Sequence, residues 1–369
     1  MNEELLVSHI ALSLIPQIGD THISALLKHF DSPDQIFRSS MKELECISGI
    51  GSIRALQIKQ FKDFDEAKKE LEFSVNSNIQ VLVKGCRTYP QRLENCIDAP
   101  HILYYKGSAD LNVNKIVSIV GTRAPTDYGR QRTIELVQSL AAQSILIVSG
   151  LAYGIDTIAH KESVRMDMAT VAVLGHGLQH LYPHANKSLA FEMLQQGGLL
   201  TEFLHGKKPD KQNFPRRNRV VAGIADAVVV IESGEKGGSL ITADIANSYN
   251  KDVLAYPGRS TDLQSTGCNQ LIRGHKANLI TNGQELIQFM NWEPVKSVQR
   301  AIQPELFINL DDNEKIMYEF IRDKQPVSID EIIVSSAMKP NFIPAIILSL
   351  EMKSLVVSFP GKFYKTASR

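Results

Sequence analysis

The sequence predicts an α/β protein in which a doubly wound, mostly parallel β-sheet follows a helical N-terminal domain and precedes a winged helix. Short runs rich in valine and isoleucine, apolar on both faces, recur through residues 81–290, which is typical of parallel strands covered by helices on both sides. Most runs begin about 25–30 residues apart, which leaves room for a crossover helix. The ligand site of such a sheet lies outside the carboxyl ends of its strands. The runs are 101–107, 116–122, 144–150, 169–175, 198–203, 226–233 and 252–258.

Residues 1–80 are expected to form a helical domain with two helix-hairpin-helix-like (SAM-like) units. The segments 15–30 and 47–61 resemble one another, because each has an apolar–glycine turn followed by an amphipathic helix. Such a turn beside a helix start can present backbone N–H groups to a phosphate. The alternative is that the glycines only allow close helix packing, since the helices carry as much acid as base. A DNA contact by this domain therefore stays open.

Residues 291–310 contain two prolines and no clear period, which predicts a linker. Residues 311–369 show three helical patterns and a short hairpin with its turn at Pro360-Gly361, and together these predict a winged-helix domain. The third helix is apolar and carries one base, Lys353, whereas a helix that reads base edges needs more polar and basic groups. Protein contact or regulation is therefore favoured over DNA reading. The helical patterns span 314–322, 328–336 and 341–353.

Four glycine-containing turns follow strands along one predicted edge of the sheet. Small residues let the backbone approach an oxygen atom, and the free N–H groups of a helix start can point at it, so each turn is a candidate anion site. No turn matches the dinucleotide fingerprint or the P-loop, so we expect neither NAD nor ATP, and no cofactor. The turns contain Gly121-Thr122-Arg123, Gly150 with Gly154, Gly175 with Gly177, and Gly237-Gly238-Ser239 with Thr242 in the next helix.

A basic stretch over residues 205–220 begins at the same edge. It holds one acid, Asp210, and six bases, in a chain whose 40 basic and 40 acidic residues give no net charge. Cations at a helix start oppose the helix dipole, so a bound polyanion is the expected compensation. The alternative is pairing with an acid at the sheet edge, such as Glu202 or Glu232, which we expect for at least one arginine but not for all six bases. The bases are Lys207, Lys208, Lys211, Arg216, Arg217 and Arg219.

Three aromatic residues, Phe214, Tyr153 and Tyr182, are predicted to lie near the basic stretch, and aromatic faces among cations suit unpaired nucleic-acid bases. His160 and Asp156 lie four residues apart in one predicted helix, so they could serve as a catalytic base and the acid that orients it. No nucleophile motif accompanies them, so a capping aspartate and a packed histidine are favoured, and we predict no catalytic residue.

Composition favours a cytoplasmic protein with reduced thiols. The four cysteines include no C-x-x-C pair, and His176 and His180 lack a third ligand at a fitting spacing, so no metal site is predicted. The N-terminal segment lacks the basic region and cleavage site of a secretory signal. No apolar run approaches the roughly 18 residues of a membrane span, so no membrane association is expected.

Several motifs stand in a characteristic order along the chain: SIVGTRAPTDYG, VSGLAYGIDTIAH, FPRRNRVVAGIADAVVVIES, GGSLITADIA, YPG and STGCNQLIRGHKA. In these motifs, over residues 85–290, the chain resembles the DNA-processing protein A family (DprA/Smf). The resemblance implies an extended Rossmann-like core that binds single-stranded DNA and forms a homodimer. It further implies a protein that is not an enzyme, and that protects incoming DNA and helps to load the RecA recombinase in natural transformation.

The resemblance also implies which residues bind DNA. Arg123 would contact a phosphate, Lys211 would extend the pocket, and His184 or Lys187 would replace a lysine that the family often has after its Tyr-Pro pair. With about five phosphates neutralised, the logarithm of the affinity should fall with that of the salt concentration at a slope near −3.5. The implied residues are Gly121, Thr122, Arg123, Gly150, Lys211, Phe214, Arg216, Arg217, Asn218, Arg219, Gly237, Gly238, Ser239 and Thr242.

Two other classes of function compete with DNA binding. A hydrolase that cleaves nucleoside monophosphates on a similar sheet would use a P-G-G-x-G-T-x-x-E turn. The equivalent stretch here, EKGGSLITADI, lacks the proline and the glutamate. A scaffold that works only through its terminal domains would leave the basic stretch unexplained.

Overall fold

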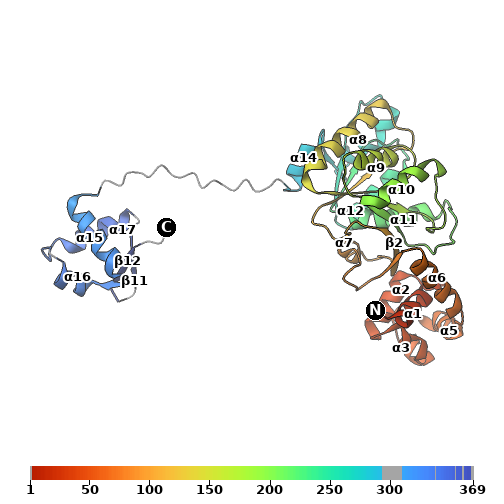
Figure 1. The fold of residues 1–369 in the computed structure, drawn as a ribbon, viewed down its shortest axis with the longest axis horizontal. Coiled ribbons are helices and arrows are strands. Elements are labelled where there is room, and N and C mark those ends of the chain that lie inside the picture. The colour runs from red at the N-terminus through yellow and green to blue at the C-terminus, as the bar shows by residue number, and fades with distance from the viewer. Residues whose placement is uncertain (1, 293–309, 337, 354, 360, 367–369) are drawn as a thin grey trace. The chain divides into compact units, whose positions relative to one another are not determined.

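The computed structural model describes residues 2–292, 310–336, 338–353, 355–359 and 361–366. The chain divides into two compact units, the first ending at Trp292 (Figure 1). Most of the predicted linker 291–310 lies outside the described residues. The helical segment 1–80 and the sheet that follows it belong to the first unit.

Six helices form the N-terminal part of the described first unit, and the first five of them enclose an apolar core of their own. The two predicted apolar–glycine turns are present, and Gly49 and Gly51 adopt positive φ angles of 85° and 56°. Arg54 donates to the carbonyl oxygens of Gln17 (3.1 Å) and Gly49 (2.8 Å), so one arginine ties the two turns together. The helices are α1 (Glu3–Leu14), α2 (Asp20–His29), α3 (Pro33–Arg38), α4 (Met41–Glu45), α5 (Gly51–Gln60) and α6 (Phe64–Asn76).

The described part of the first unit contains a nine-stranded sheet in the order β1-β2-β6-β5-β4-β3-β7-β8-β9. All strands that follow β2 in this order run parallel to one another, from β6 through β5, β4, β3, β7 and β8 to β9. β2 pairs antiparallel with both β1 and β6. All seven predicted runs form strands, whereas β1 and β9 were not predicted. The strands are β1 (Gln80–Val83), β2 (Ile102–Gly107), β3 (Ile116–Val120), β4 (Leu146–Ser149), β5 (Thr170–Leu174), β6 (Gly198–Thr201), β7 (Ala227–Val230), β8 (Asp252–Ala255) and β9 (Asn278–Leu279).

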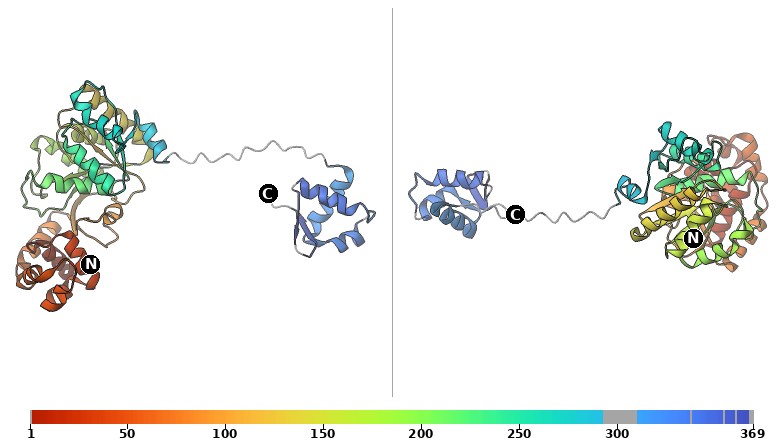
Figure 2. Two further views of the ribbon diagram at one scale, coloured as in Figure 1. Left: turned by 180° about the vertical axis from the view of Figure 1, so that it is seen from behind. Right: turned by 90° about the horizontal axis from the view of Figure 1, so that it is seen from above.

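Helices cover both faces of the sheet, as a doubly wound fold requires (Figure 2). Successive residues of β3 alternate between the faces: Val117 and Ile119 pack toward α8, α9 and α14, and Ile116 and Val120 pack toward α7, α11, α12 and α13. The helices are α7 (Gln91–Glu94), α8 (Asp127–Leu140), α9 (Ile155–Arg165), α10 (Lys187–Gln196), α11 (Asn213–Ile224), α12 (Gly238–Ser248), α13 (Thr266–Arg273) and α14 (Gly283–Phe289).

The second unit contains the three helices and the hairpin predicted for the tail. Its sheet has the order β10-β12-β11, and Pro360 of the predicted turn lies outside the described residues. The ammonium group of Lys353 bonds to both carboxylate oxygens of Glu314, so the base at the end of the third helix is engaged within the unit. The assignment to the winged-helix class stays a prediction. The elements are α15 (Asp312–Lys324), β10 (Val327–Ser328), α16 (Ile329–Ser335), α17 (Ile343–Met352), β11 (Val356–Phe359) and β12 (Phe363–Thr366).

Among the residues that the structure describes, no helix combines the length and the apolar character needed to cross a bilayer.

Candidate functional site

A cleft of about 510 Å³ opens at the carboxyl edge of the sheet. Its walls come from the turns after β3 and β4, from the start of α11 and from the start of α12. The strand order reverses between β3 and β7, so the cleft lies at the topological switch point where open α/β sheets bind ligands. The predicted site residues that line it are Gly121, Thr122, Arg123, Gly150, Lys211, Phe214, Arg217, Asn218, Gly237, Gly238, Ser239 and Thr242.

Arg217 is the buried cation of the cleft, with only 4% of its surface exposed. Its Nη1 donates to the carbonyl oxygen of Val173 (2.7 Å), and its guanidinium lies against Gly150, where a Cβ atom would come within 1.7 Å of Nη1. Burial lowers the pKa of Arg217, and the charge of Asp156 opposes this effect. Its Nε has no hydrogen-bond partner among the described residues. A bound anion would therefore stabilise the charge of Arg217.

Arg123 is an exposed cation of the cleft, and its guanidinium carbon lies 5.4 Å from the centre of the Phe214 ring. The guanidinium of Arg217 lies 6.0 Å from the same ring, and the ring of Tyr182, 45% exposed, lies 6.2 Å away from it. Contacts of this kind orient a guanidinium without neutralising it. Lys211 is also exposed, and no carboxylate pairs with Arg123 or Lys211 in the described part of the chain.

The start of α12 forms one wall of the cleft. Gly237 precedes the helix, no side chain of the described residues caps its first N–H groups, and its first turn contains no acid. A Cβ atom on Gly238 would meet nothing within 4 Å, so the backbone at this point faces open space. Unpaired N–H groups at a helix start carry partial positive charge, which adds to the charge of the arginines.

Gly154 brings two of the predicted turns together. Its φ angle is +82°, and a Cβ atom there would lie 2.2 Å from the carbonyl oxygen of Thr122. Glycine therefore allows the turn after β4 to lie against the turn after β3, which places Gly150 and Arg123 on the same cleft.

Sequence reasoning did not assign Asp156 to the cleft, although it lines the wall. Its carboxylate accepts the N–H of Ala152 (3.2 Å), and burial raises its pKa. His160 lies outside the cleft: it is fully buried, its Nδ1 lies 2.7 Å from the hydroxyl of Thr170, and burial lowers its pKa to about 3. The prediction of a packed histidine is therefore confirmed. The four-residue spacing of Asp156 and His160 does not indicate that the side chain of Asp156 lines a cleft.

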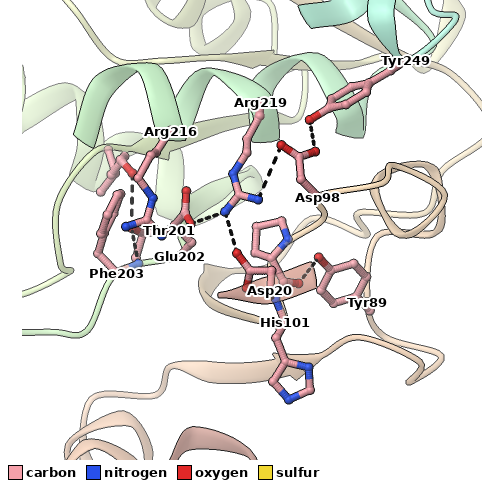
Figure 3. A network of polar contacts seen from close by, with 12 residues as sticks. Asp20, Tyr89, Asp98, His101, Thr201, Glu202, Phe203, Arg216, Arg219 and Tyr249 are labelled. Atoms are coloured by element: carbon pink, nitrogen blue, oxygen red, sulfur yellow. Dashed lines mark hydrogen bonds and ion pairs between the residues drawn. The ribbon is translucent and has the colours of Figure 1, made fainter. Parts of the chain in front are cut away.

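The structure corrects the predicted placement of Arg216 and Arg219, which do not line the cleft. Both guanidinium groups bond to the same carboxylate oxygen of Glu202, at 3.0 Å from Arg216 and 2.5 Å from Arg219 (Figure 3). Successive residues of a helix are rotated by about 100°, so Arg217 can face the cleft while Arg216 and Arg219 face elsewhere. The prediction that at least one arginine pairs with a sheet-edge acid is confirmed for Glu202. Glu232 instead accepts from the backbone and hydroxyl of Thr126.

In the residues that the structure describes, no group of three or more histidine, cysteine, aspartate or glutamate side chains is arranged to hold a metal ion. Nε2 of His176 accepts the backbone N–H of Tyr182 (3.2 Å), and Nε2 of His180 lies 3.2 Å from the carbonyl oxygen of Gly206.

Residues 80–291 match the family model of the DNA recombination-mediator protein A, which covers more than half of the chain and every cleft residue. The chain belongs to the DprA/Smf family. Protein Smf from Synechocystis is 31% identical over 96% of this chain and 97% of its own length. DNA processing protein DprA from Streptococcus pneumoniae is 38% identical over 63% of this chain and 81% of its own.

Two solved DprA structures share this fold. The X-ray structure of DprA from Streptococcus pneumoniae superposes with a TM-score of 0.66 at 33% identity, over 76% of this chain and 96% of that one. A structure of DprA from Helicobacter pylori, described as giving insight into its single-stranded DNA binding mode, superposes with a TM-score of 0.53 at 32% identity. That match covers 58% of this chain and 95% of the other.

Proposed function

We propose that the cleft binds the sugar–phosphate backbone of single-stranded DNA. The observation that carries this proposal is the convergence of Arg123, Lys211 and Arg217 on the uncapped start of α12. Guanidinium groups and helix N–H groups are the usual partners of phosphate oxygens. The DprA structure from Helicobacter pylori, with its single-stranded DNA binding mode, supports the same ligand.

Aromatic side chains favour a single strand over a duplex. Tyr153 and Tyr182 are each nearly half exposed, and Phe214 lines the cleft between the arginines and Tyr182. Such rings stack on unpaired bases, which a duplex keeps inside its own stack. Binding should tolerate any sequence, because phosphate contacts carry no sequence information.

We further propose that two copies pair in the cytoplasm, so that one strand engages two clefts and gains avidity without new contacts. The bound strand would be shielded and passed to the RecA recombinase during recombination and natural transformation. Membership of the DprA/Smf family supports this role.

The proposed role requires no bond cleavage, so we propose that the protein is not an enzyme. The turn at Gly237-Gly238 lacks the proline and glutamate expected of a nucleoside-monophosphate hydrolase. Release of free base from nucleoside monophosphates, abolished by Asp156→Asn, would contradict this part of the proposal.

The test is fluorescence anisotropy with a labelled thymidine oligonucleotide and a duplex of equal length. The wild type should bind the single strand more tightly, and Arg123→Ala should weaken this binding about tenfold, since a charge-assisted contact is lost. The control is Arg273→Ala, because Arg273 is exposed at the end of the helix that leads to the amino end of β9, away from the cleft edge. Equal affinity for strand and duplex, or equal affinities of both variants, would refute the proposal.

A further inference from the structure

A second charged cluster lies beside α11, where the N-terminal helices meet the sheet (Figure 3), and none of its residues lines the cleft. We call it the clasp. It pairs two guanidinium groups with three carboxylates. The clasp therefore contains more acids than bases, and both of its arginines form ion pairs with residues of the same chain. The clasp consists of Asp20, Asp98, Glu202, Arg216 and Arg219.

Arg219 is the centre of the clasp. Its Nη2 lies 2.5 Å from Glu202 Oε2 and 3.0 Å from Asp20 Oδ2, and its side chain is 10% exposed. Burial opposes the charge of Arg219, but Glu202 and Asp20 together more than offset this and raise its pKa. Oδ1 of Asp20 accepts the N–H of His101 (2.8 Å), the residue before β2. Asp20, in the first turn of α2, thus ties the N-terminal helices to both α11 and the sheet.

Both helices that wall the cleft are held by the clasp. Arg219 lies two positions after Arg217 on α11, and the hydroxyl of Tyr249, the residue directly after α12, donates to Asp98. The start of each helix faces the cleft, at Phe214 and at Gly238 respectively. A change in the clasp would therefore act on both of these helices.

We infer that Asp20 is a positioning residue for the cleft, although none of the described lining residues comes from segment 1–80. Through Arg219 it fixes the rotation of α11 about its axis, and this rotation sets where Arg217 presents its guanidinium. The N-terminal helices thereby control the affinity of a site that they do not touch. The inference rests on the proposed function only for the identity of the ligand.

The test replaces Asp20 by asparagine, which keeps the size and the acceptor for His101 but removes the charge opposite Arg219. Asp226→Asn is the matched control, because Asp226 also accepts a backbone N–H, from Ile116 (2.9 Å), and an arginine, Arg92 (2.6 Å). Asp226 directly precedes β7 and therefore lies at the amino edge of the sheet, opposite the cleft.

Two readouts are compared: the dissociation constant for a labelled thymidine oligonucleotide, and the hydrogen exchange of the backbone amides of residues 217–221, which lie within α11. Asp20→Asn should raise the dissociation constant about fivefold and speed the exchange. Asp226→Asn should change neither, although both substitutions lower the melting temperature. Arg219→Lys keeps a cation but loses the forked geometry, so its affinity should lie between those of the wild type and Arg219→Ala.

If Asp20→Asn lowers the melting temperature but leaves affinity and exchange at wild-type values, the clasp is only a structural ion pair and the inference is wrong. Equal weakening by Asp20→Asn and Asp226→Asn would also overturn it, because general softening would then explain both. If the wild type does not bind DNA, the proposed function fails. The exchange readout then decides the inference alone: faster exchange in Asp20→Asn upholds it and unchanged exchange overturns it.

Discussion

At the scale of single residues, Gly150 shows how closely backbone and side chain approach one another in the cleft. An alanine there would place its methyl group 1.7 Å from Nη1 of Arg217, so the guanidinium would have to leave its position. We expect Gly150→Ala to weaken single-stranded DNA binding about tenfold, because a charge-assisted contact is displaced. Fluorescence anisotropy measures the effect, and circular dichroism checks that the fold is kept.

Gly206→Ala is the control for this substitution. An added methyl group at Gly206 meets only the end of the Gln179 side chain, at 3.7 Å. Its affinity should therefore equal that of the wild type. If Gly150→Ala binds as tightly as Gly206→Ala, the guanidinium of Arg217 does not contribute to the site.

The direction of the arginine side chains could be predicted from the sequence only in part. Strand ends are visible in the sequence, so the basic stretch was placed at the correct edge of the sheet. The side of α11 that each base faces depends on how this helix, which begins at Asn213, packs against the sheet. Asp20, the second acid that Arg219 contacts, is 199 positions away in the sequence, and no local pattern connects the two residues.

At the scale of elements, the buried strands were predictable and the edge strands were not. The seven predicted strands are runs of apolar residues that pack on both faces. β9 has two residues, both exposed, so it lacks the apolar run that marks a strand. β1 has four residues, of which Gln80 is exposed. Such strands form because they can pair with the free edge of a neighbouring strand. This pairing depends on the tertiary structure and cannot be predicted from the local sequence.

The contact between α15 and α17 should make the second unit sensitive to acid. Glu314 accepts from Lys353, Ser349 and the backbone of Asp311, and these hydrogen bonds, Lys353 first, lower its pKa from 4.5 to about 2. A carboxyl whose pKa is lower in the folded state stabilises the fold above its unfolded pKa. This stabilisation should be lost as the pH falls from about 4.5 to about 2.

Hydrogen exchange of the amides of residues 312–324 in the full chain, corrected for the intrinsic effect of pH, measures this loss. Protection should decrease over that pH range in the wild type and should be independent of it in Glu314→Gln. A wild type whose protection stays constant down to pH 2 would contradict the assignment.

At the scale of the whole molecule, the chain has no net charge. Only the cations of the cleft should therefore make the DNA affinity depend on the salt concentration. Among the residues described by the structure, three cations line the cleft: Arg123, Lys211 and Arg217. The slope of log affinity against log salt should therefore be about −2, with an affinity loss of about twentyfold between 50 and 200 mM salt. The sequence alone predicted a steeper slope, because it assumed that about five phosphates are neutralised.

Anisotropy titrations at several salt concentrations check this value. A slope of about −3.5 or steeper would mean that the arginines held by Glu202 also reach the DNA. A slope near zero would remove the electrostatic basis of the cleft.

The cover that α1 and α6 provide over one end of the sheet has a practical consequence. Ile10, Ala11 and Leu71 of these helices pack in one apolar cluster with Ile102 and Tyr104 of β2. A shortened protein that starts near residue 80 would expose this apolar surface to water and should aggregate. A truncated protein could therefore fail to bind DNA only because it is insoluble. Single substitutions avoid this problem, because they leave α1 and α6 in place over the sheet.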